Sequence, residues 1–167
     1  MDTGIIVRTG TPEDYETIIS IMPMWWDGRD LTHMIMKLFF YHFQDTIFIA
    51  EKDGELVGFL IGFLSQSAAN EGYIHFAGIH PSHRRTGLGR TLYQRFFDEC
   101  KKHDRNVVRS CTSPINTLSI AFHQHMGCEI EPGDSAVDGF PVRTNYHRKD
   151  DAPKVLFKKT LNPSSEN

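Results

Sequence analysis

The sequence has few cysteines, no excess of basic charge and no long apolar run, and each shortage excludes a class of protein. Its 167 residues include three cysteines, which are odd in number and widely spaced: Cys100, Cys111 and Cys128. This usage indicates reduced thiols in a cytoplasmic protein rather than a disulfide framework or a zinc site. A net charge of −3 argues against general nucleic-acid binding, which needs a broad basic face.

The chain also lacks the apolar segments that membrane insertion and export require. No run approaches the roughly 20 apolar residues that a spanning helix needs. The start, Met1-Asp2-Thr3, has neither the basic residues nor the apolar core of a signal peptide. We therefore expect a soluble protein without a membrane partner. Its length suits a single domain over residues 1–161, followed by a disordered tail at 162–167.

Hydrophobic periodicity predicts strands and helices along most of the chain. The expected strands cover residues 5–8, 46–52, 55–64, 73–79, 106–112, 128–130 and 155–159. The expected helices cover residues 11–21, 31–43, 87–103 and 116–126. The first is capped at Thr11 and ends before Pro23, and the third has one apolar stripe, formed by Leu88, Leu92, Phe96 and Cys100. An antiparallel meander with a turn at Asp53-Gly54 comes first, and a parallel strand–helix–strand step follows. The fold class is therefore α/β (α+β), with a mixed sheet.

The most informative segment is a basic, glycine-bearing turn between a predicted strand and a predicted helix. Gly87 and Gly89 lack a Cβ, so a ligand can approach the backbone closely. The first amides of the helix have no intrahelical partner, and the helix dipole adds positive partial charge there. Full charges come from Arg84, Arg85 and Arg90. This combination suits a phosphate or diphosphate group.

The spacing of this turn is Arg-x-x-Gly-x-Gly after Ile79-x-Pro81, which is neither a Walker A loop nor Gly-x-Gly-x-x-Gly. It resembles the central motif of the GNAT superfamily of N-acetyltransferases. A second family element is matched by Asn116-x-x-Ser119-x-x-Phe122-His123-x-x-x-Gly127. The order of the predicted elements also matches the GNAT fold, which implies a mixed sheet of six to seven strands flanked by about four helices.

The resemblance implies an acetyl-coenzyme A-dependent N-acetyltransferase that transfers the acetyl group directly to a primary amine of a small molecule. In this family the amides of the turn hold the diphosphate of acetyl-coenzyme A. The implied coenzyme-binding residues are Ile79, Arg84, Arg85, Thr86, Gly87, Leu88, Gly89, Arg90, Asn116, Ser119 and Phe122. Asn116 is also a good N-cap and Phe122 a good core residue, so both have a purely structural alternative.

His123 stands where the family carries the tyrosine that protonates the leaving thiolate. Imidazole can do the same chemistry, so His123 is predicted to be the general acid. The alternative is that His123 only packs against the coenzyme and that water carries the proton. A further departure from the family, Cys128 in place of phenylalanine, is a change in packing.

The attacking amine must lose a proton, because a free alkylammonium has a pKa near 10. If the strand at 73–79 alternates without interruption, His75 and Tyr73 face the acceptor while Ile79 lies beside the coenzyme. His75 is therefore the first candidate for general base, through a water, and Glu71 is the second. The alternative is a half-buried structural histidine. The family resemblance implies that a backbone amide around Gly78 and Ile79, at the splayed end of this strand, faces the oxyanion, and a bulge at Gly78 is expected to splay the strand.

The acceptor is expected to contact the aromatic stretch with Trp25, Trp26 and Asp27, as well as Tyr73. The long connection at 132–153 is predicted to form the other wall. No metal is expected, and a homodimer is compatible with the family resemblance. Two alternative functions remain: a non-catalytic acyl-coenzyme A-binding sensor domain, and an acetyltransferase for a protein lysine or N-terminus.

Overall fold

The structure is a computed structural model that describes residues 4–162, so the predicted tail at 162–167 lies outside the described residues except for Asn162. Its centre is a seven-stranded sheet in the order β1-β2-β3-β4-β5-β9-β6. The strands are β1 (Ile5–Thr9), β2 (Ile47–Lys52), β3 (Glu55–Leu64), β4 (Glu71–Ile79), β5 (Val107–Thr112), β6 (Glu129–Ile130) and β9 (Val155–Thr160). Neighbours are antiparallel except β4 and β5, which run parallel. The predicted mixed sheet is confirmed.

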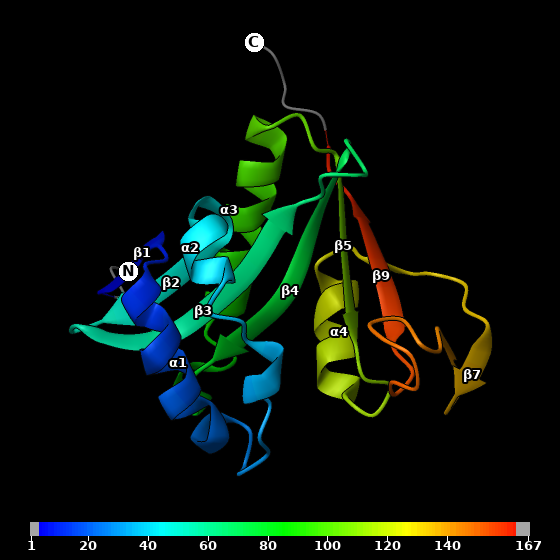
Figure 1. The fold of residues 1–167 in the computed structure, drawn as a ribbon, viewed down its shortest axis with the longest axis horizontal. Helices are drawn as coiled ribbons and strands as arrows, with labels where there is room; N and C mark the ends of the chain where they lie inside the picture. The colour runs from blue at the N-terminus through cyan, green and yellow to red at the C-terminus, as the bar shows by residue number, and fades with distance from the viewer. Residues whose placement is uncertain (1–3, 163–167) are drawn as a thin grey trace.

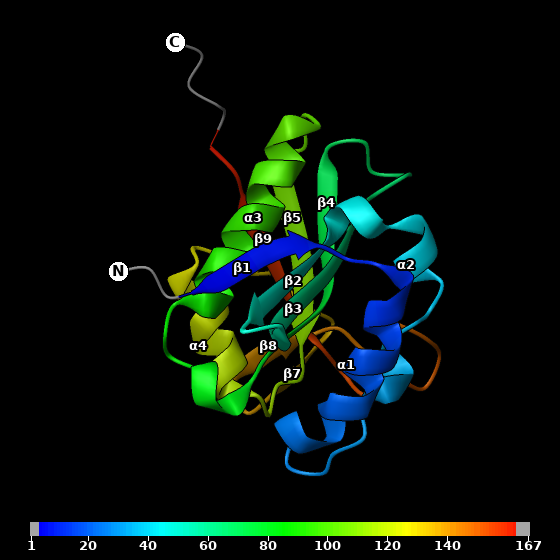
Figure 2. The same ribbon diagram turned by 90° about the vertical axis from the view of Figure 1, so that its left-hand side faces the viewer.

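Four α-helices in the described part of the chain pack on the two faces of this sheet (Figures 1 and 2). They are α1 (Pro12–Trp25), α2 (Phe39–His42), α3 (Leu88–Lys102) and α4 (Thr117–His125). Helices α1 and α2 cover one face, and α3 covers the other. None of the helices in residues 4–162 is long and apolar enough to cross a membrane.

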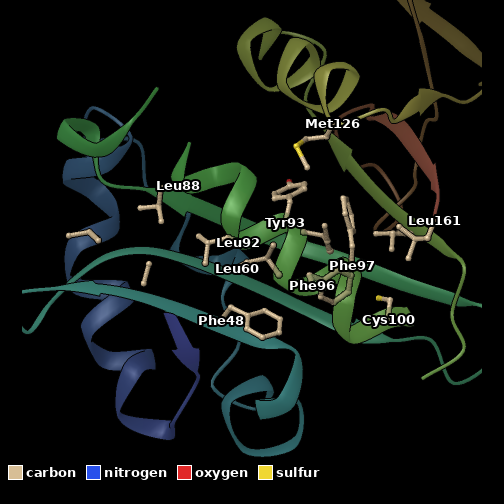
Figure 3. Packing of buried hydrophobic residues seen from close by; sticks show 14 residues of the cluster. Phe48, Leu60, Leu88, Leu92, Tyr93, Phe96, Phe97, Cys100, Met126 and Leu161 are labelled. Atoms are coloured by element: carbon tan, nitrogen blue, oxygen red, sulfur yellow. The ribbon is translucent and has the colours of Figure 1, made fainter. Parts of the chain in front are cut away.

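Strands β2 and β3 are buried on both faces, which is why their sequences are almost continuously apolar. Phe48 and Leu60 point toward α3, where they meet its apolar stripe of Leu92, Phe96 and Cys100 (Figure 3). Neighbouring residues of the same strands point toward α1 and α2. The predicted stripe on α3 is therefore the main contact of that helix with the sheet.

Helix α1 begins as predicted but ends later. The Asp14 carboxylate accepts hydrogen bonds from the backbone N–H of Thr11 at 2.7 Å and from its hydroxyl at 3.1 Å. The prediction that the helix stops before Pro23 is wrong, because it continues to Trp25. Trp25 is 3% exposed, and its ring stacks on the ring of Phe59 with centroids 5.9 Å apart. This packing offsets the backbone hydrogen bond that a proline removes.

The predicted helix at 31–43 is also wrong. The segment forms a 3-10 turn at Thr32–Met34 and the short helix α2, separated by an irregular stretch. Its apolar residues are spread around the helical period, so a single helix cannot bury them all against one sheet face. Ile35 and Phe40 are buried, whereas Met36 and Leu38 stay about half exposed.

The connection at 132–153 contains a hairpin that the sequence analysis missed. Strands β7 (Ser135–Val137) and β8 (Phe140–Val142) pair around a turn with positive φ at Asp138 and Gly139. Val142 is buried together with Val155 and Phe157. The hairpin therefore anchors the first half of the connection to β9, and residues 143–154 follow it.

Strands β4 and β5 pair only at their beginnings. Their register joins Glu71 to Val107, Gly72 to Val108 and Tyr73 to Arg109. Beyond these pairs the two strands diverge, as Figure 1 shows. We call the diverging segments, residues 74–79 of β4 and 110–112 of β5, the fork. Because a strand that leaves its neighbour exposes backbone groups on that side, the fork is a natural place for a ligand to bind.

Candidate active site

The turn after β4 is tied to the end of α1. The Arg84 guanidinium donates to the carbonyl of Trp25 at 2.5 Å and to that of Ile79 at 3.2 Å. His80 accepts through Nδ1 from the backbone N–H of Ser82 at 3.1 Å, which caps a 3-10 turn at Pro81–His83. Arg84 therefore shapes the turn through two main-chain contacts, while its predicted contact with the coenzyme remains a prediction.

Six successive backbone amides, those of residues 85–90, have no hydrogen-bond acceptor among the described residues. Gly87 has φ of +88° and caps the N-terminus of α3, and a Cβ there would meet nothing within 4 Å. The side chains of Arg85 and Arg90 are on exposed residues at the same turn. A row of free donors beside two cations, with open space in front of Gly87, fits a diphosphate.

Helix α4 meets the start of α3. A Cβ on Gly89 would lie 3.4 Å from the Phe122 ring, and that ring lies edge-on to Tyr93 at 4.9 Å. The Asn116 side chain accepts from the backbone N–H of Ser119 at 3.1 Å, so it caps α4. The structure thus brings together the two motifs from which coenzyme binding was predicted.

His123 is buried between α3, α4 and β9. Its Nδ1 lies 2.7 Å from the carbonyl oxygen of Ser119, and its Nε2 lies 3.0 Å from the hydroxyl of Tyr93. The ring stacks on Phe157 with centroids 4.2 Å apart. A carbonyl only accepts, so we assign the proton to Nδ1, and Nε2 accepts from Tyr93.

Burial lowers the pKa of His123, partly opposed by its bond to Ser119. The imidazole is therefore neutral at neutral pH, and its single proton is directed at a carbonyl. To act as general acid, His123 must take part in a rearrangement of these bonds or pass protons through the Tyr93 hydroxyl. The predicted role of His123 stays a prediction with this added requirement.

Strand β4 contains a bulge at His75, ahead of Gly78. Phe76 lies opposite Ile61 and Ile74 lies opposite Gly62, so His75 has no partner on β3. The predicted uninterrupted alternation is therefore wrong. Ala77 and Ile79 pack toward α3, whereas the ring of His75 lies against the ring of Phe39 in α2, with centroids 5.2 Å apart.

The predicted bulge at Gly78 is also wrong, and that glycine has another role. A Cβ at Gly78 would lie 2.5 Å from Trp26, so only glycine lets this ring lie on the strand. Trp26 also contacts Phe76 at 5.4 Å. Trp25 is part of the core, and Asp27 is exposed in the turn that follows α1. Of the predicted acceptor residues at the end of α1, Trp25 is thus the one withdrawn into the core.

His75 has a defined orientation. Its Nε2 lies 2.6 Å from the carbonyl oxygen of Met34, which requires Nε2 to carry the proton and donate. The other nitrogen, Nδ1, has no hydrogen-bond partner among residues 4–162 and is left with a lone pair. This tautomer is the one that a general base needs.

Glu71, the second candidate base, is held in an ion-pair network. Its carboxylate accepts from Arg109 Nε at 2.9 Å, and the same guanidinium donates to Glu131. Burial lowers the pKa of Arg109, but its bonds to Glu71 and Glu131 prevail and raise it. Because a carboxylate bound to a guanidinium is a poor proton acceptor, this contact favours His75 as the base.

A further group at the fork was missed by the sequence analysis. Cys111 Sγ lies 3.3 Å from His147 Nε2, and His147 Nδ1 lies 3.8 Å from an Asp151 carboxylate oxygen. The Tyr73 hydroxyl donates to the same sulfur at 3.7 Å. We call Cys111, His147, Asp151 and Tyr73 the Cys111 cluster. Of its members, Tyr73 was predicted to face the acceptor. The sequence signal for His147 and Asp151 is their place in the long connection predicted to line the acceptor, and Cys111 has none.

Comparison with known proteins identifies the fold and the family. A family model described as the Acetyltransferase (GNAT) family matches residues 15–128, which is more than half of the chain. The chain belongs to this family. The predicted membership and fold class are therefore confirmed.

Among curated relatives, this GNAT protein is 33% identical over 79 residues to the L-2,4-diaminobutyric acid acetyltransferase of Nocardia farcinica. The match covers 47% of this chain and 41% of that protein, so it spans less than half of the relative.

Solved structures resemble this GNAT chain over nearly its whole length. Ard1 from Thermoplasma volcanium superimposes with a TM-score of 0.76 at 20% identity, covering 96% of this chain and 99% of that one. A second structure is the diaminobutyrate acetyltransferase EctA from Paenibacillus lautus, in complex with L-2,4-diaminobutyric acid and coenzyme A. It superimposes with a TM-score of 0.66 at 18% identity, covering 93% of this chain and 94% of that one. At these identities the likeness shows the fold.

Proposed function

We propose that this protein is an acetyl-coenzyme A-dependent N-acetyltransferase that transfers the acetyl group directly to a primary amine of a small molecule. The row of six unpartnered amides at the start of α3, directly after the fork, carries the proposal. The family supports the acetyl donor, and a relative named for diaminobutyric acid supports a small amine.

The coenzyme diphosphate would bind the amides of residues 85–90, with Arg85 and Arg90 adding charge. The rest of the coenzyme would follow the edge of β4 in the fork, since β5 leaves that edge after Tyr73. Phe122 and the capped start of α4 at Asn116 lie beside the same turn. The acetyl group would thereby reach the middle of the fork.

The acceptor would approach from the face of the sheet that carries α1 and α2. On that face His75 presents Nδ1, Trp26 covers Gly78, and the Cys111 cluster closes the β5 side. His75 would take the proton from the ammonium group, directly or through a water. A backbone N–H of β4 near Gly78 would stabilise the oxyanion as the tetrahedral intermediate forms. The proton for the departing thiolate would come from His123 and Tyr93 or from water.

The test is a screen for coenzyme A release. Purified protein with acetyl-coenzyme A would be offered 2,4-diaminobutyrate, other amino acids, polyamines, aminoglycosides and peptides in parallel. We expect thiol release that depends on at least one small amine, with the N-acetyl product confirmed by mass spectrometry. Binding of acetyl-coenzyme A without turnover of any amine would favour a sensor domain, and turnover of peptides alone would favour a protein acetyltransferase.

A further inference from the structure

The Cys111 cluster has the arrangement of a nucleophile with its base. The sulfur of Cys111 and Nε2 of His147 are within hydrogen-bond reach, and Asp151 lies on the far side of the imidazole. A nucleophile, a base beside it and a third group that orients the base form the pattern of an activated thiol. The side chains of His147 and Asp151 are 22% and 17% exposed, so the cluster is partly shielded from water.

The position of the cluster connects it to the proposed reaction. Cys111 lies on β5 two residues beyond Arg109, the last residue that pairs with β4. It therefore lies within the fork, where the acetyl group is proposed to arrive. The ring of His147 is 6.5 Å from that of His75, the candidate base, so an amine bound at His75 would be next to Cys111.

The other two thiols are placed differently. Cys100 is fully buried on the face of α3 that packs against the sheet, and burial raises its pKa to about 12. Cys128 packs between α4 and the end of the sheet, where burial raises its pKa to about 11. Among the three cysteines, Cys111 alone has an imidazole within hydrogen-bond distance in the described structure.

We propose that Cys111 is a second acetyl acceptor, so that the protein acetylates its own fork when no amine is bound. The proposal rests on the proposed function, because the acetyl group comes from acetyl-coenzyme A held at the start of α3. The product, an S-acetyl cysteine beside His75, would occupy the space of the acceptor amine. Its amount would follow the ratio of acetyl-coenzyme A to free coenzyme A.

The step is a thioester exchange. The Cys111 sulfur forms a bond to the acetyl carbon as His147 Nε2 takes the thiol proton, and the bond between that carbon and the coenzyme sulfur breaks. His147 then returns the proton to the coenzyme thiolate. One thioester and one thiol are consumed and one of each is formed, so the exchange is reversible and needs no oxidant.

The protonation states at rest suit this sequence. Burial raises the pKa of Cys111, against the hydrogen bond from Tyr73, and burial also lowers the pKa of His147. At neutral pH the pair is therefore a neutral thiol beside a neutral imidazole. The proton moves only when the sulfur attacks, as it does in enzymes whose nucleophile is activated by an adjacent base.

The experiment incubates the full-length protein with acetyl-coenzyme A and no amine, quenches in acid, and measures intact mass and the acetylated peptide. We expect one acetyl group on Cys111, released by neutral hydroxylamine and by added free coenzyme A. Cys111→Ala should lose the modification. Cys128→Ala, the matched control, should keep it. His147→Gln should slow its appearance by about 10²-fold, the low end of the range for proton transfer by a side chain.

Calorimetry of acetyl-coenzyme A and amine turnover on the same samples separate the two proposals. Binding and turnover without acetyl-Cys111 would overturn this inference and leave the proposed function intact. An acetyl group on Cys128, or equal acetylation of Cys111 in urea-unfolded protein, would also overturn it, because the structure would then play no part. Absence of any binding to the wild-type protein would overturn both.

Discussion

The two sides of the fork offer different kinds of groups to the ligands proposed to bind there. On the side of α3, the turn at residues 85–90 offers main-chain amides whose geometry depends on one glycine with positive φ. On the side of α1, the site consists of side chains from separate segments: His75 of β4, Cys111 of β5 and His147 of the long connection. A main-chain site is fixed by local sequence, whereas a side-chain site depends on how distant segments meet.

The largest effect is expected from a charge placed on the main-chain side. Gly87→Asp would put a carboxylate in front of the free amides, so binding of acetyl-coenzyme A and turnover should both be lost. Calorimetry would measure the binding. Gly54→Asp is the matched control, because Gly54 also has positive φ and open space, but lies in the turn between β2 and β3. Equal affinity in Gly87→Asp and wild type would contradict the assignment of the turn.

The second-largest effect is expected from His123, the buried residue predicted to be the general acid. His123→Phe keeps the stack on Phe157 but removes the partner of the Tyr93 hydroxyl. We expect kcat to fall by roughly 10²- to 10⁴-fold with little change in coenzyme affinity. His123→Tyr should restore part of the rate, and His125→Phe on the exposed face of α4 should leave it unchanged. If His123→Phe keeps the full kcat while the chemical step is rate-limiting, the proton for the departing thiolate must come from water.

The same variant has a pH signature. The folded pKa of His123 is lowered below the ordinary value of about 6.5, so the unfolded chain binds the extra proton first as pH falls. This burial therefore costs stability progressively from about pH 6.5 down to the folded pKa. Urea unfolding at a series of pH values should show a smaller loss on acidification in His123→Phe than in wild type.

A smaller effect is expected on the side-chain side. His75→Ala removes the free Nδ1 and should lower kcat/KM by about 10²-fold, because the side chain at that position can then no longer accept a proton. His42→Ala, on the exposed part of α2, is the control. An unchanged kcat/KM in His75→Ala would move the base to water or to Glu71.

The smallest effect on activity is expected from the anchor of α1, which is remote from both ligands. Burial raises the pKa of Asp14, but its hydrogen bonds to Arg8 at 2.8 Å and to Thr11 prevail and lower it. Its contribution is thus present above the ordinary value of 3.8 and is lost as pH falls further. Asp14→Asn should cost about 2 kcal/mol in urea unfolding at neutral pH, with kcat unchanged. Glu16→Gln, whose ion pair with Lys37 is exposed, should leave the urea unfolding curve nearly unchanged.

Most of the fold, and the glycine turn of the candidate site, could be predicted from residues that lie close together in the sequence. The stripe on α3, the cap at Thr11 and the glycine turn each depend on residues close in sequence, so periodicity and motif spacing predict them. The prediction of one helix at 31–43 failed because only some of its apolar residues are buried in the core, whereas Met36 and Leu38 stay about half exposed. The expected alternation along 73–79 failed because the bulge at His75 arises from the register with β3 and leaves no local pattern in the sequence.

The side-chain part of the site was only half predictable. His75 was predicted as the base from its place in the strand, although the bulge changes the face of the sheet on which it lies relative to Ile79. Cys111 and His147 are 36 residues apart, and their contact depends on the course of the connection after the β7–β8 hairpin. A cysteine in an apolar strand resembles any core residue until such a partner is placed beside it.

The bulge in β4 has a consequence for how this strand can change. Without His75, the strand would alternate regularly, with Gly72, Ile74, Ala77 and Ile79 toward α3 and Tyr73, Phe76 and Gly78 toward α1. His75 is thus a surplus residue in the packing of the sheet, and a chain lacking it has a core pattern already in place. Exchange or deletion of the residue at this position is therefore expected to disturb the packing of the sheet less than the same change at its neighbours.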